Sequence, residues 1–256
     1  ALSIAAGHGT YSVGRVQTPT LGMVCERYWE NRRFTPEAFW QLHIAVNGND
    51  NDGTVKLSSS GKWKEKEPAT ALYNKVKEAG TATVTKVERK EKTEETPLLF
   101  DLTTLQKEAN AKHGFTAEQT LGIAQKLYEK KLITYPRTGS RYIPEDVFSE
   151  IPKLLAFIGA MPEWKGKVQE KAGPTRRSVD GGKVTDHHAL LVTGEKPLFL
   201  SKEDSTVYQM IAGRMIEAFS EKCVKDVTNV TAECVGVEFA VKGSVIRQAG
   251  WRAVYG

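Results

Sequence analysis

The chain has 256 residues, of which 40% are hydrophobic, so it is long and apolar enough for a real core split into more than one unit. A formal net charge of +5 and a pI near 9.0 favour a polyanionic partner without proving one. No apolar run is long enough to span a membrane, and Cys25, Cys223 and Cys234 lack the paired spacing of a zinc site. These features predict a soluble protein of the reducing cytoplasm.

The first predicted helix carries the first of three motifs. Thr18 is a good N-cap residue, Pro19 suits the first helical position, and an apolar stripe follows at helical spacing: Leu21, Val24, Cys25 and Tyr28. A helix N-terminus offers spare N–H donors and the positive end of the helix dipole, so it is a natural phosphate site, and Arg15 lies just before it. An ordinary capped helix after a turn explains these residues equally well.

The following segments alternate between strand and helix patterns. Strands are predicted for residues 40–46, 54–57, 62–65 and 81–89, with a turn cluster at 47–53 and a short helix at 68–80. Helical spacing then runs from 100 to 131 with a break at 113–114, and again over 145–158. A basic loop at 164–182 precedes a helix that Ser201 and Asp204 cap, and strands close the chain at 227–237 and 238–248. The late strands are expected to pair with the early set around Trp40.

The second motif places a tyrosine between a helix end and a proline. Thr116 and Gln119 form a T-x-x-Q capping box at the start of that helix. Pro136 stops the helix and biases Tyr135 toward an extended backbone, in which Tyr135 and Arg137 project to the same side. A nucleophile and a cation can then meet one phosphate. By itself, a Tyr-Pro pair at a helix exit is more often a core or boundary tyrosine.

The third motif holds two adjacent histidines, His187 and His188, before an apolar run. Adjacent histidines can serve a metal, a proton transfer or a phosphate contact. Without further context, the same pair more often marks the entry to a strand.

Together and in this order, the motifs resemble those of bacterial type IA DNA topoisomerases, most closely the topoisomerase III kind. The matching segments are Ser12-Val-Gly-Arg-Val-Gln-Thr-Pro-Thr-Leu21, Ile133-Thr-Tyr-Pro-Arg-Thr-Gly-Ser140 and Asp186-His-His-Ala-Leu190. The likeness extends over nearly the whole chain. It implies an isomerase whose tyrosine attacks single-stranded DNA, becomes joined to a 5′ phosphate and later reseals the strand after another strand has passed.

The resemblance also implies roles for individual residues. Tyr135 is the nucleophile, and Arg137 and His187 hold and neutralise the scissile phosphate. The expected DNA contacts are Arg15, Gln17, Thr18, Thr138, Ser140, Arg141 and His188. The chemistry agrees, because a phenol is almost wholly protonated at neutral pH and the site must stabilise developing negative charge with placed cations. The aryl phosphodiester conserves the energy of the broken bond, and the chain has no G-x-x-x-x-G-K-[ST] loop for ATP.

The expected fold class is α+β. A β-rich arch, discontinuous in sequence, receives an inserted, mostly helical tyrosine domain of winged-helix-like form, although a plain helical bundle explains the periodicity equally well. We expect a helical base-domain segment at 1–36, the first part of the arch at 37–96, the tyrosine domain at 97–196, a base-domain helix at 197–222 and the return strands at 223–256. Residues 93–98 and 193–197 would be the two hinge strands.

Family resemblance implies a TOPRIM domain with a D-x-D-x-E cluster that binds Mg²⁺, and no D-x-D-x-E occurs in this chain. The chain also opens at Ala1 without a methionine. We therefore expect a central fragment that holds no metal site or cofactor of its own and is inactive in relaxation by itself. Its expected partners are DNA, mainly single-stranded, and the TOPRIM and base domains of its parent chain, in the cytoplasm at the nucleoid and not at a membrane.

Two other classes of protein remain open. A non-catalytic single-strand-binding module would grip DNA with basic grooves and aromatics such as Trp29, Trp40 and Tyr142. A tyrosine recombinase also forms phosphotyrosine, but usually places its tyrosine near the C-terminus after its Arg and His residues. Here Tyr135 stands before His187, which argues against a recombinase.

Overall fold

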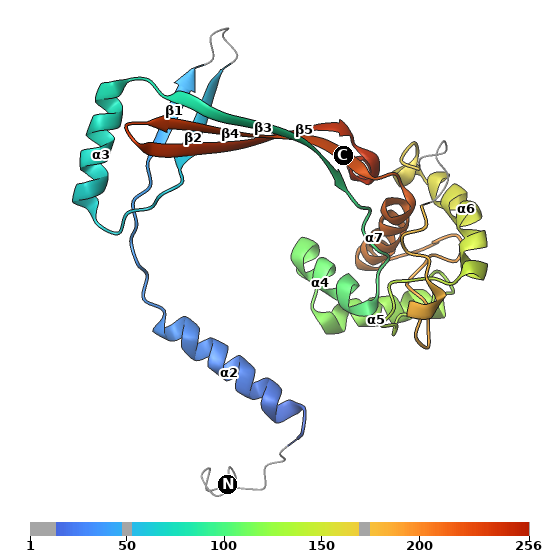
Figure 1. The fold of residues 1–256 in the computed structure, drawn as a ribbon. Helices are drawn as coiled ribbons and strands as arrows, with labels where there is room; N and C mark the ends of the chain where they lie inside the picture. Colours follow the sequence, from blue (N-terminus) through green and yellow to red (C-terminus); the bar gives the residue numbers. More distant parts are fainter. Residues whose placement is uncertain (1–13, 48–52, 169–174, 256) are drawn as a thin grey trace, which may run out of the picture. The chain divides into compact units, whose positions relative to one another are not determined.

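The computed structural model describes residues 14–47, 53–168 and 175–255, and the chain forms two compact units (Figure 1). Unit 1 contains residues 1–84 and 232–240, and unit 2 contains residues 85–231 and 241–256. Each unit is thus assembled from two separate stretches of sequence. The predicted division into an arch, a tyrosine domain and base-domain segments stays a prediction.

The expected mixture of helices and strands is confirmed. The strands form one five-stranded sheet in the order β1-β2-β5-β4-β3. Its strands are β1 His43–Asn47, β2 Thr54–Ser59, β3 Thr83–Glu94, β4 Cys223–Cys234 and β5 Val237–Gln248. In unit 1, β2 pairs antiparallel with β1 on one side and with β5 on the other, where Ser58 lies opposite Ala240. The predicted pairing of the late strands with the early set is confirmed. It is this pairing that makes unit 1 discontinuous in sequence.

One predicted strand is absent, and several predicted strand boundaries were wrong. Residues 62–65 are not a strand, because only Trp63 forms an isolated bridge, with Trp40, before helix α3 (Lys66–Ala79) begins. Helix α3 ends at Gly80, whose φ of 65° is a left-handed conformation that glycine adopts without steric cost. Strand β3 also continues five residues beyond Arg89, to Glu94. Of the predicted turn at 47–53, residues 48–52 lie outside the described part of the chain.

Helix α2 (Gln17–Arg33) starts one residue earlier than Thr18, which therefore is not the N-cap. Val16 occupies the cap position without a side-chain hydrogen bond, and the Thr18 amide already donates to the Gly14 carbonyl. Pro19 falls at the third helical position, within the first turn, where proline is tolerated. The predicted apolar stripe is present but buries none of its residues against the described parts of the chain.

Most α-helices of unit 2 begin at strong capping residues, and the exception is the helix after Pro144, which has no side-chain cap. The α-helices of this unit are α4 (Leu102–His113), α5 (Ala117–Glu129), α6 (Glu145–Gly159) and α7 (Lys202–Phe219). The predicted T-x-x-Q capping box is confirmed, since the Thr116 hydroxyl accepts from the Gln119 amide and the Gln119 side chain accepts from the Thr116 amide. The predicted cap at Ser201 is also confirmed, since its hydroxyl accepts from the Asp204 amide. Side-chain acceptors for otherwise orphaned N–H groups explain why these helices start where they do.

Helix α7 is the centre of the unit 2 core. It is buried over most of its length and contacts α4, α5, α6 and the 3₁₀ helix η3 (Gly250–Val254) (Figure 1). The predicted base-domain helix therefore packs into the same unit as the segment that bears Tyr135. Gly250 holds η3 close to the preceding chain, because a Cβ at this position would lie 2.3 Å from the Lys222 carbonyl oxygen.

A buried arginine ties α7 to α4. Arg214 is only 6% exposed, and its Nε donates to Glu217 at 2.9 Å while its Nη2 donates to Glu108 on α4. Its third nitrogen donates to the Leu98 carbonyl, and the guanidinium lies 4.0 Å from the ring centroid of Phe100. A buried charge requires such complete pairing. Arg214 therefore fixes where the chain passes from β3 into the helices.

The predicted hinge strand at 193–197 is wrong. Gly194 has a φ of 91°, and the Thr193 amide donates to the Leu132 carbonyl at the end of a short pairing that lies outside the five-stranded sheet. The sheet neighbour of β3 is β4. A left-handed glycine followed by a proline at 197 cannot continue a strand.

Candidate active site

The end of helix α5 sets the direction of the chain that leads to Tyr135. The Lys131 amide donates to the Tyr128 carbonyl at 2.8 Å, and the Leu132 amide donates to the Leu127 carbonyl at 2.9 Å. These two bonds form a Schellman motif, with Lys131 in the left-handed position at φ 60°. Leu127 and Leu132 are both buried, as the hydrophobic contact of this motif requires. The motif reverses the chain immediately before the active-site segment.

We expect Lys131→Gly to stabilise unit 2 by up to about 1 kcal/mol, because a left-handed conformation costs a side-chain-bearing residue about that much. The adjacent Lys130 has a φ of −76°, so Lys130→Gly should instead destabilise by about 0.5–1 kcal/mol. Thermal unfolding of the two variants checks this. Equal effects of both substitutions would contradict the assigned role of Lys131.

After the turn, residues 132–134 lie antiparallel to residues 191–193. Ile133 bridges Val192, and the Thr134 amide donates to the Leu191 carbonyl at 2.9 Å. The Thr134 hydroxyl also accepts from the Leu191 amide at 3.0 Å. The residue directly before Tyr135 is therefore held on both its main chain and its side chain.

This pairing brings the second and third motifs together. The ring centroids of Tyr135 and His187 lie 4.6 Å apart with their planes at 51°, and Tyr135 is half-buried while His187 is exposed. On another side, Tyr128 meets Tyr135 edge to face at a centroid distance of 5.3 Å. Tyr128 belongs to none of the three sequence motifs. Its spacing of seven residues from Tyr135 gave no signal of this contact.

Exposure alternates along the segment after Tyr135. Pro136 and Thr138 are buried, whereas Tyr135 is half-buried and Arg137 exposed, as an extended chain that projects Tyr135 and Arg137 to one side requires. Among the described residues, no acidic side chain pairs with Arg137. Its guanidinium is thus open to an anionic ligand from solution.

Three of the predicted DNA-binding residues have internal partners. The Thr138 hydroxyl donates to the His187 carbonyl at 2.8 Å, and the buried Ser140 hydroxyl donates to the Lys183 carbonyl at 2.9 Å. The Arg141 Nε donates to the Leu99 carbonyl at 3.0 Å. These contacts fix the loop that carries Arg137 and link it to the histidine segment.

The two histidines differ in what their rings contact. The His188 Nδ1 lies 2.7 Å from the carbonyl of Ala189 and the residue is half-buried, whereas the His187 ring lies against Tyr135. A nitrogen at that distance from a carbonyl acts as the donor. The structure therefore leaves the His187 imidazole as the member of the pair beside the phenol.

The predicted contacts of the first motif belong to unit 1. Arg15 and Gln17 are exposed at the start of α2, and Thr18 is half-buried. Residues 11–13 of the motif lie outside the described part of the chain.

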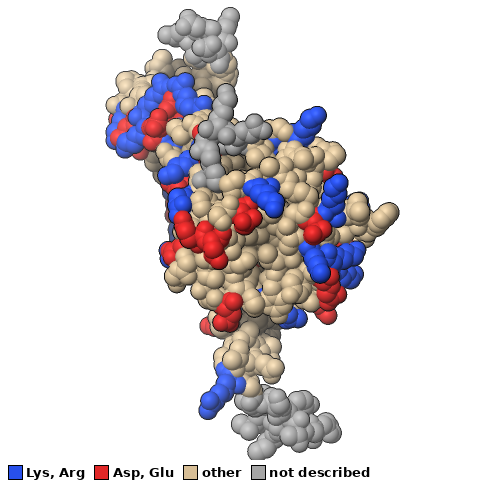
Figure 2. Space-filling model, turned by 90° about the vertical axis from the view of Figure 1, so that its right-hand side faces the viewer, with Lys and Arg blue, Asp and Glu red and all other residues tan. Residues whose placement is uncertain are grey.

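The surface charges are mixed. Figure 2 shows Lys and Arg side chains interspersed with Asp and Glu on the face that it presents. Several bases are paired, such as Arg89 and Arg247, which both contact Asp226 and lower the pKa of its carboxyl. On this face, the positive net charge is not gathered into one basic field.

No three His, Cys, Asp or Glu side chains gather as metal ligands anywhere in residues 14–47, 53–168 and 175–255. The candidate site consists of the Tyr135 phenol, the His187 imidazole and the Arg137 guanidinium, of which only the imidazole is a usual metal ligand. This set does not fit a Mg²⁺ site, and we derive no step through a metal. None of the described helices is long and apolar enough to cross a membrane.

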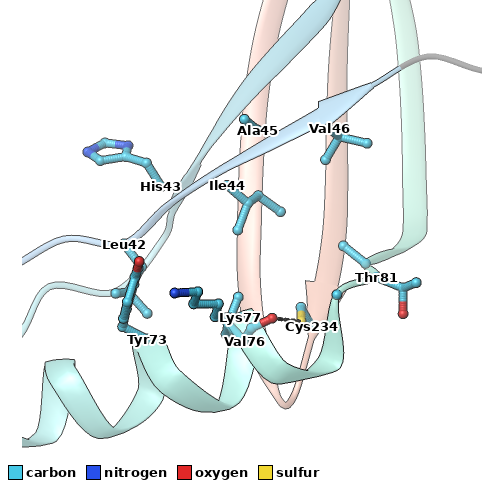
Figure 3. Close-up of a pocket in the computed structure, with 12 residues that line it drawn as sticks. Leu42, His43, Ile44, Ala45, Val46, Tyr73, Val76, Lys77, Thr81 and Cys234 are labelled. Carbon is cyan, nitrogen blue, oxygen red and sulfur yellow. Dashed lines mark hydrogen bonds between the residues drawn. The ribbon is translucent and has the colours of Figure 1, made fainter.

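Unit 1 contains a separate cavity of about 300 Å³ (Figure 3). It is lined mainly by β1 and by the C-terminal part of α3, including Ile44, Tyr73 and Val76. The buried Cys234 closes one end, with its Sγ 4.0 Å from the Val76 carbonyl oxygen. The cavity contains no residue of the three motifs, so it is not part of the candidate active site.

A phenol in contact with an imidazole, with an exposed guanidinium two residues further along the chain, offers the kinds of group that a tyrosine nucleophile needs for attack on a phosphodiester. Comparison with known proteins supports the same class. A family model described as DNA topoisomerase matches residues 1–256, and the chain belongs to this family. The resemblance to the type IA enzymes is thereby confirmed.

Individual relatives of this chain carry a more specific name than the family model does. DNA topoisomerase 3 of Bacillus subtilis is 33% identical over 251 residues, in a match that covers 95% of this chain and 34% of that protein. DNA topoisomerase 3 of Bacillus cereus is 32% identical over 256 residues, covering 94% of this chain and 34% of that protein. The chain thus spans about a third of the length of these curated relatives.

The fold matches a solved structure of full-length topoisomerase I from Thermotoga maritima with a TM-score of 0.71. The match covers 96% of this chain and 41% of that chain at 23% sequence identity. At this identity, the likeness concerns the fold alone.

Proposed function

We propose that this chain carries the tyrosine half of a type IA topoisomerase active site, with Tyr135 as the nucleophile that cleaves one strand of DNA. The observation that supports this most directly is the contact of the Tyr135 ring with His187 beside the exposed Arg137. Core tyrosines are normally enclosed by apolar side chains. Tyr135 instead lies half-buried in contact with the aromatic rings of Tyr128 and His187, two residues before an arginine that no acidic side chain of the described residues pairs with.

In the proposed step, the Tyr135 Oη bonds to phosphorus while the bond from phosphorus to the 3′ oxygen breaks. The phenol loses its proton, and the 3′ oxygen gains one. The products are a 5′ phosphotyrosine and a free 3′ hydroxyl, which reseals the strand by the reverse attack without ATP. Arg137 and His187 stabilise the charge on the phosphate oxygens during both steps.

The remaining residues divide into two groups. Thr138, Ser140 and Arg141 hold the loop through their main-chain contacts, so we propose that they act on DNA mainly by fixing the position of Arg137. Arg15, Gln17, Thr18 and His188 are proposed as strand contacts, among which Arg15 and Gln17 are exposed. A preference for single-stranded DNA is part of the proposal.

The activity of a whole topoisomerase requires more than this chain, which covers about a third of its curated relatives. We propose that Mg²⁺ and the transfer of a proton to the leaving 3′ oxygen are supplied by a TOPRIM domain elsewhere in the parent protein. The chain alone should then not relax supercoiled DNA. The parent would act as an ATP-independent isomerase on DNA at the nucleoid.

The roles of the two phosphate-binding groups can be tested by single-turnover cleavage of a short oligonucleotide by the parent enzyme. Arg137→Lys keeps the charge but loses the planar fork, and we expect cleavage to fall on the order of 10–100-fold. His187→Ala should lower cleavage and weaken binding, and His188→Ala should do less because its Nδ1 is engaged by the Ala189 carbonyl. A larger defect at His188 would reverse the assignment, and no defect at either would remove the pair from the mechanism.

A second candidate function is a non-catalytic single-strand-binding module. It is favoured by Tyr28 and Trp29 on α2, which are 50% and 53% exposed, with Arg32 and Arg33 lying over their rings. Exposed aromatics with adjacent cations are suited to stacking on bases. Trapping a covalent DNA adduct on the parent enzyme, and identifying the DNA end that it occupies, separates this candidate from the topoisomerase and from a recombinase.

A further inference from the structure

Tyr128 is the aromatic neighbour of Tyr135 that the proposed mechanism does not use. It lies in the last turn of α5, seven residues before Tyr135, and the two rings meet at 77° with centroids 5.3 Å apart. This is the edge-to-face geometry that aromatic pairs favour. The Tyr135 ring is therefore in contact with Tyr128 as well as with His187.

Tyr128 is not one of the buried core residues of α5. The buried residues of this helix are Thr120, Ile123, Ala124 and Leu127, whereas Tyr128 is 39% exposed. The adjacent Leu127 is fully buried and fills the core position in this turn. A large aromatic residue on the exposed side of a helix end has little to contribute to the core.

The backbone holds both tyrosines in place relative to each other. The Schellman motif at Lys131 fixes the turn between them, and Thr134 anchors the chain directly before Tyr135. What remains free is the side chain of Tyr135, which rotates about two torsions. A half-buried phenol needs side-chain neighbours to select one rotamer.

We propose that Tyr128 is a positioning residue, whose ring holds the Tyr135 phenol in the orientation from which its oxygen attacks the phosphate. The inference rests on the proposed function of Tyr135. Attack requires the reacting atoms to be close and aligned, and small misplacements of a nucleophile reduce the rate strongly. Because the contact is between rings, the hydroxyl of Tyr128 is not required.

The orientation can be measured without any activity. In the 256-residue chain labelled with ¹³C at tyrosine rings, Tyr135→Phe identifies the Tyr135 signals in NMR spectra. Tyr128→Leu removes a neighbouring ring current and should shift and broaden these signals, while Tyr128→Phe should leave them close to wild type. Tyr73→Leu, a change at a 50% exposed tyrosine on α3, is the matched control and should not affect them.

The consequence for cleavage is measured with the same changes in the parent enzyme at saturating single-stranded oligonucleotide. We expect Tyr128→Leu to lower the single-turnover rate constant on the order of 10-fold with little change in DNA affinity. Tyr128→Phe should restore the wild-type rate. Circular dichroism and thermal unfolding check that each variant is folded.

The outcomes separate this inference from the function on which it rests. Unchanged Tyr135 signals in Tyr128→Leu overturn the positioning role, as does a normal cleavage rate in a variant whose signals have shifted. A loss of cleavage in Tyr128→Phe equal to that in Tyr128→Leu also overturns it, because the hydroxyl would then be the active group. If Tyr135→Phe itself still cleaves, the proposed function fails, and the catalytic meaning of the contact fails with it, whatever the spectra show.

Discussion

Replacing Tyr135 by phenylalanine will abolish covalent cleavage of single-stranded DNA by the parent enzyme. The substitution removes only the hydroxyl, so no oxygen is left to bond to phosphorus, and the ring contacts with Tyr128 and His187 are retained. Affinity for a single-stranded oligonucleotide should therefore stay within a few fold of wild type. The measurement is the amount of DNA that remains covalently attached after denaturation, together with a separate binding titration.

Tyr208→Phe is the matched control for this change. It deletes the same hydroxyl from a fully buried tyrosine of unit 2, and the described residues offer that hydroxyl no hydrogen-bond partner. Removing an unsatisfied buried hydroxyl should be neutral or slightly stabilising, and cleavage should be unaffected. A covalent 5′ adduct formed by Tyr135→Phe would show that another residue is the nucleophile.

Replacing Arg214 by leucine will destabilise unit 2 by about 3–5 kcal/mol at neutral pH, because it leaves a buried carboxylate without its partner. Glu217 is only 7% exposed and pairs with the Arg214 Nε. The expected fall in melting temperature is on the order of 10 °C, measured by thermal unfolding. Arg247→Leu is the control, since Arg247 forms an exposed ion pair with Asp226 and such a pair contributes at most about 1 kcal/mol.

The size of the Arg214 effect should depend on pH. Burial raises the pKa of Glu217 above its ordinary value, although Arg214 opposes this shift. Burial also acts to raise the pKa of Glu108, but the hydrogen bond and charge of Arg214, together with Lys112, hold that pKa below its ordinary value. Loss of the guanidinium removes a group that lowers both pKa values, so both will rise.

The directions of these pKa shifts determine how the destabilisation by Arg214→Leu changes with pH. In the wild type, Glu108 stabilises the fold above its unfolded pKa, and this contribution is lost as the pH falls through its folded pKa. In Arg214→Leu, the pKa of Glu217 is raised further, so this carboxyl stabilises the fold only below its unfolded pKa of about 4.3, and the contribution is lost as the pH rises through its folded pKa. The stabilisation that Glu108 provides above its unfolded pKa is reduced at the same time. The difference in melting temperature should therefore be larger at about pH 8 than at about pH 5. A difference that grows toward acid would contradict the assigned ion network.

Arg214 connects the candidate active site to the core of unit 2. Its guanidinium joins α7 to α4 and to the Leu98 carbonyl. Two residues further along the chain, the Phe100 carbonyl accepts from the Leu190 amide. Leu190 belongs to the segment that leads from His187 to the pairing with residues 132–134. A core built around α7 thus supports the two strands of chain that bring Tyr135 and His187 together.

The sequence by itself determined the features that depend on neighbouring residues. The capping residues Thr116 and Ser201 start their helices as predicted, because each cap bonds an amide only three residues away. The prediction that Pro136 stops the helix capped by Thr116 was wrong, because α5 ends at Glu129 and the Schellman motif at Lys131 reverses the chain before Pro136 is reached. The three motifs identified the family, and the family model confirms it over the whole chain.

Only the tertiary structure decided which distant residues meet. The contact between Tyr135 and His187 depends on the antiparallel pairing of Ile133 with Val192, and nothing in the sequence near either residue encodes that pairing. The contact of Tyr135 with Tyr128 depends on the left-handed turn at Lys131, where a lysine gives no glycine signal. Residues 62–65 were predicted as a strand from their side-chain pattern, whereas a strand exists only where a partner accepts its hydrogen bonds. The hinge strand that the family resemblance implied at 193–197 is absent because the left-handed Gly194 turns the chain.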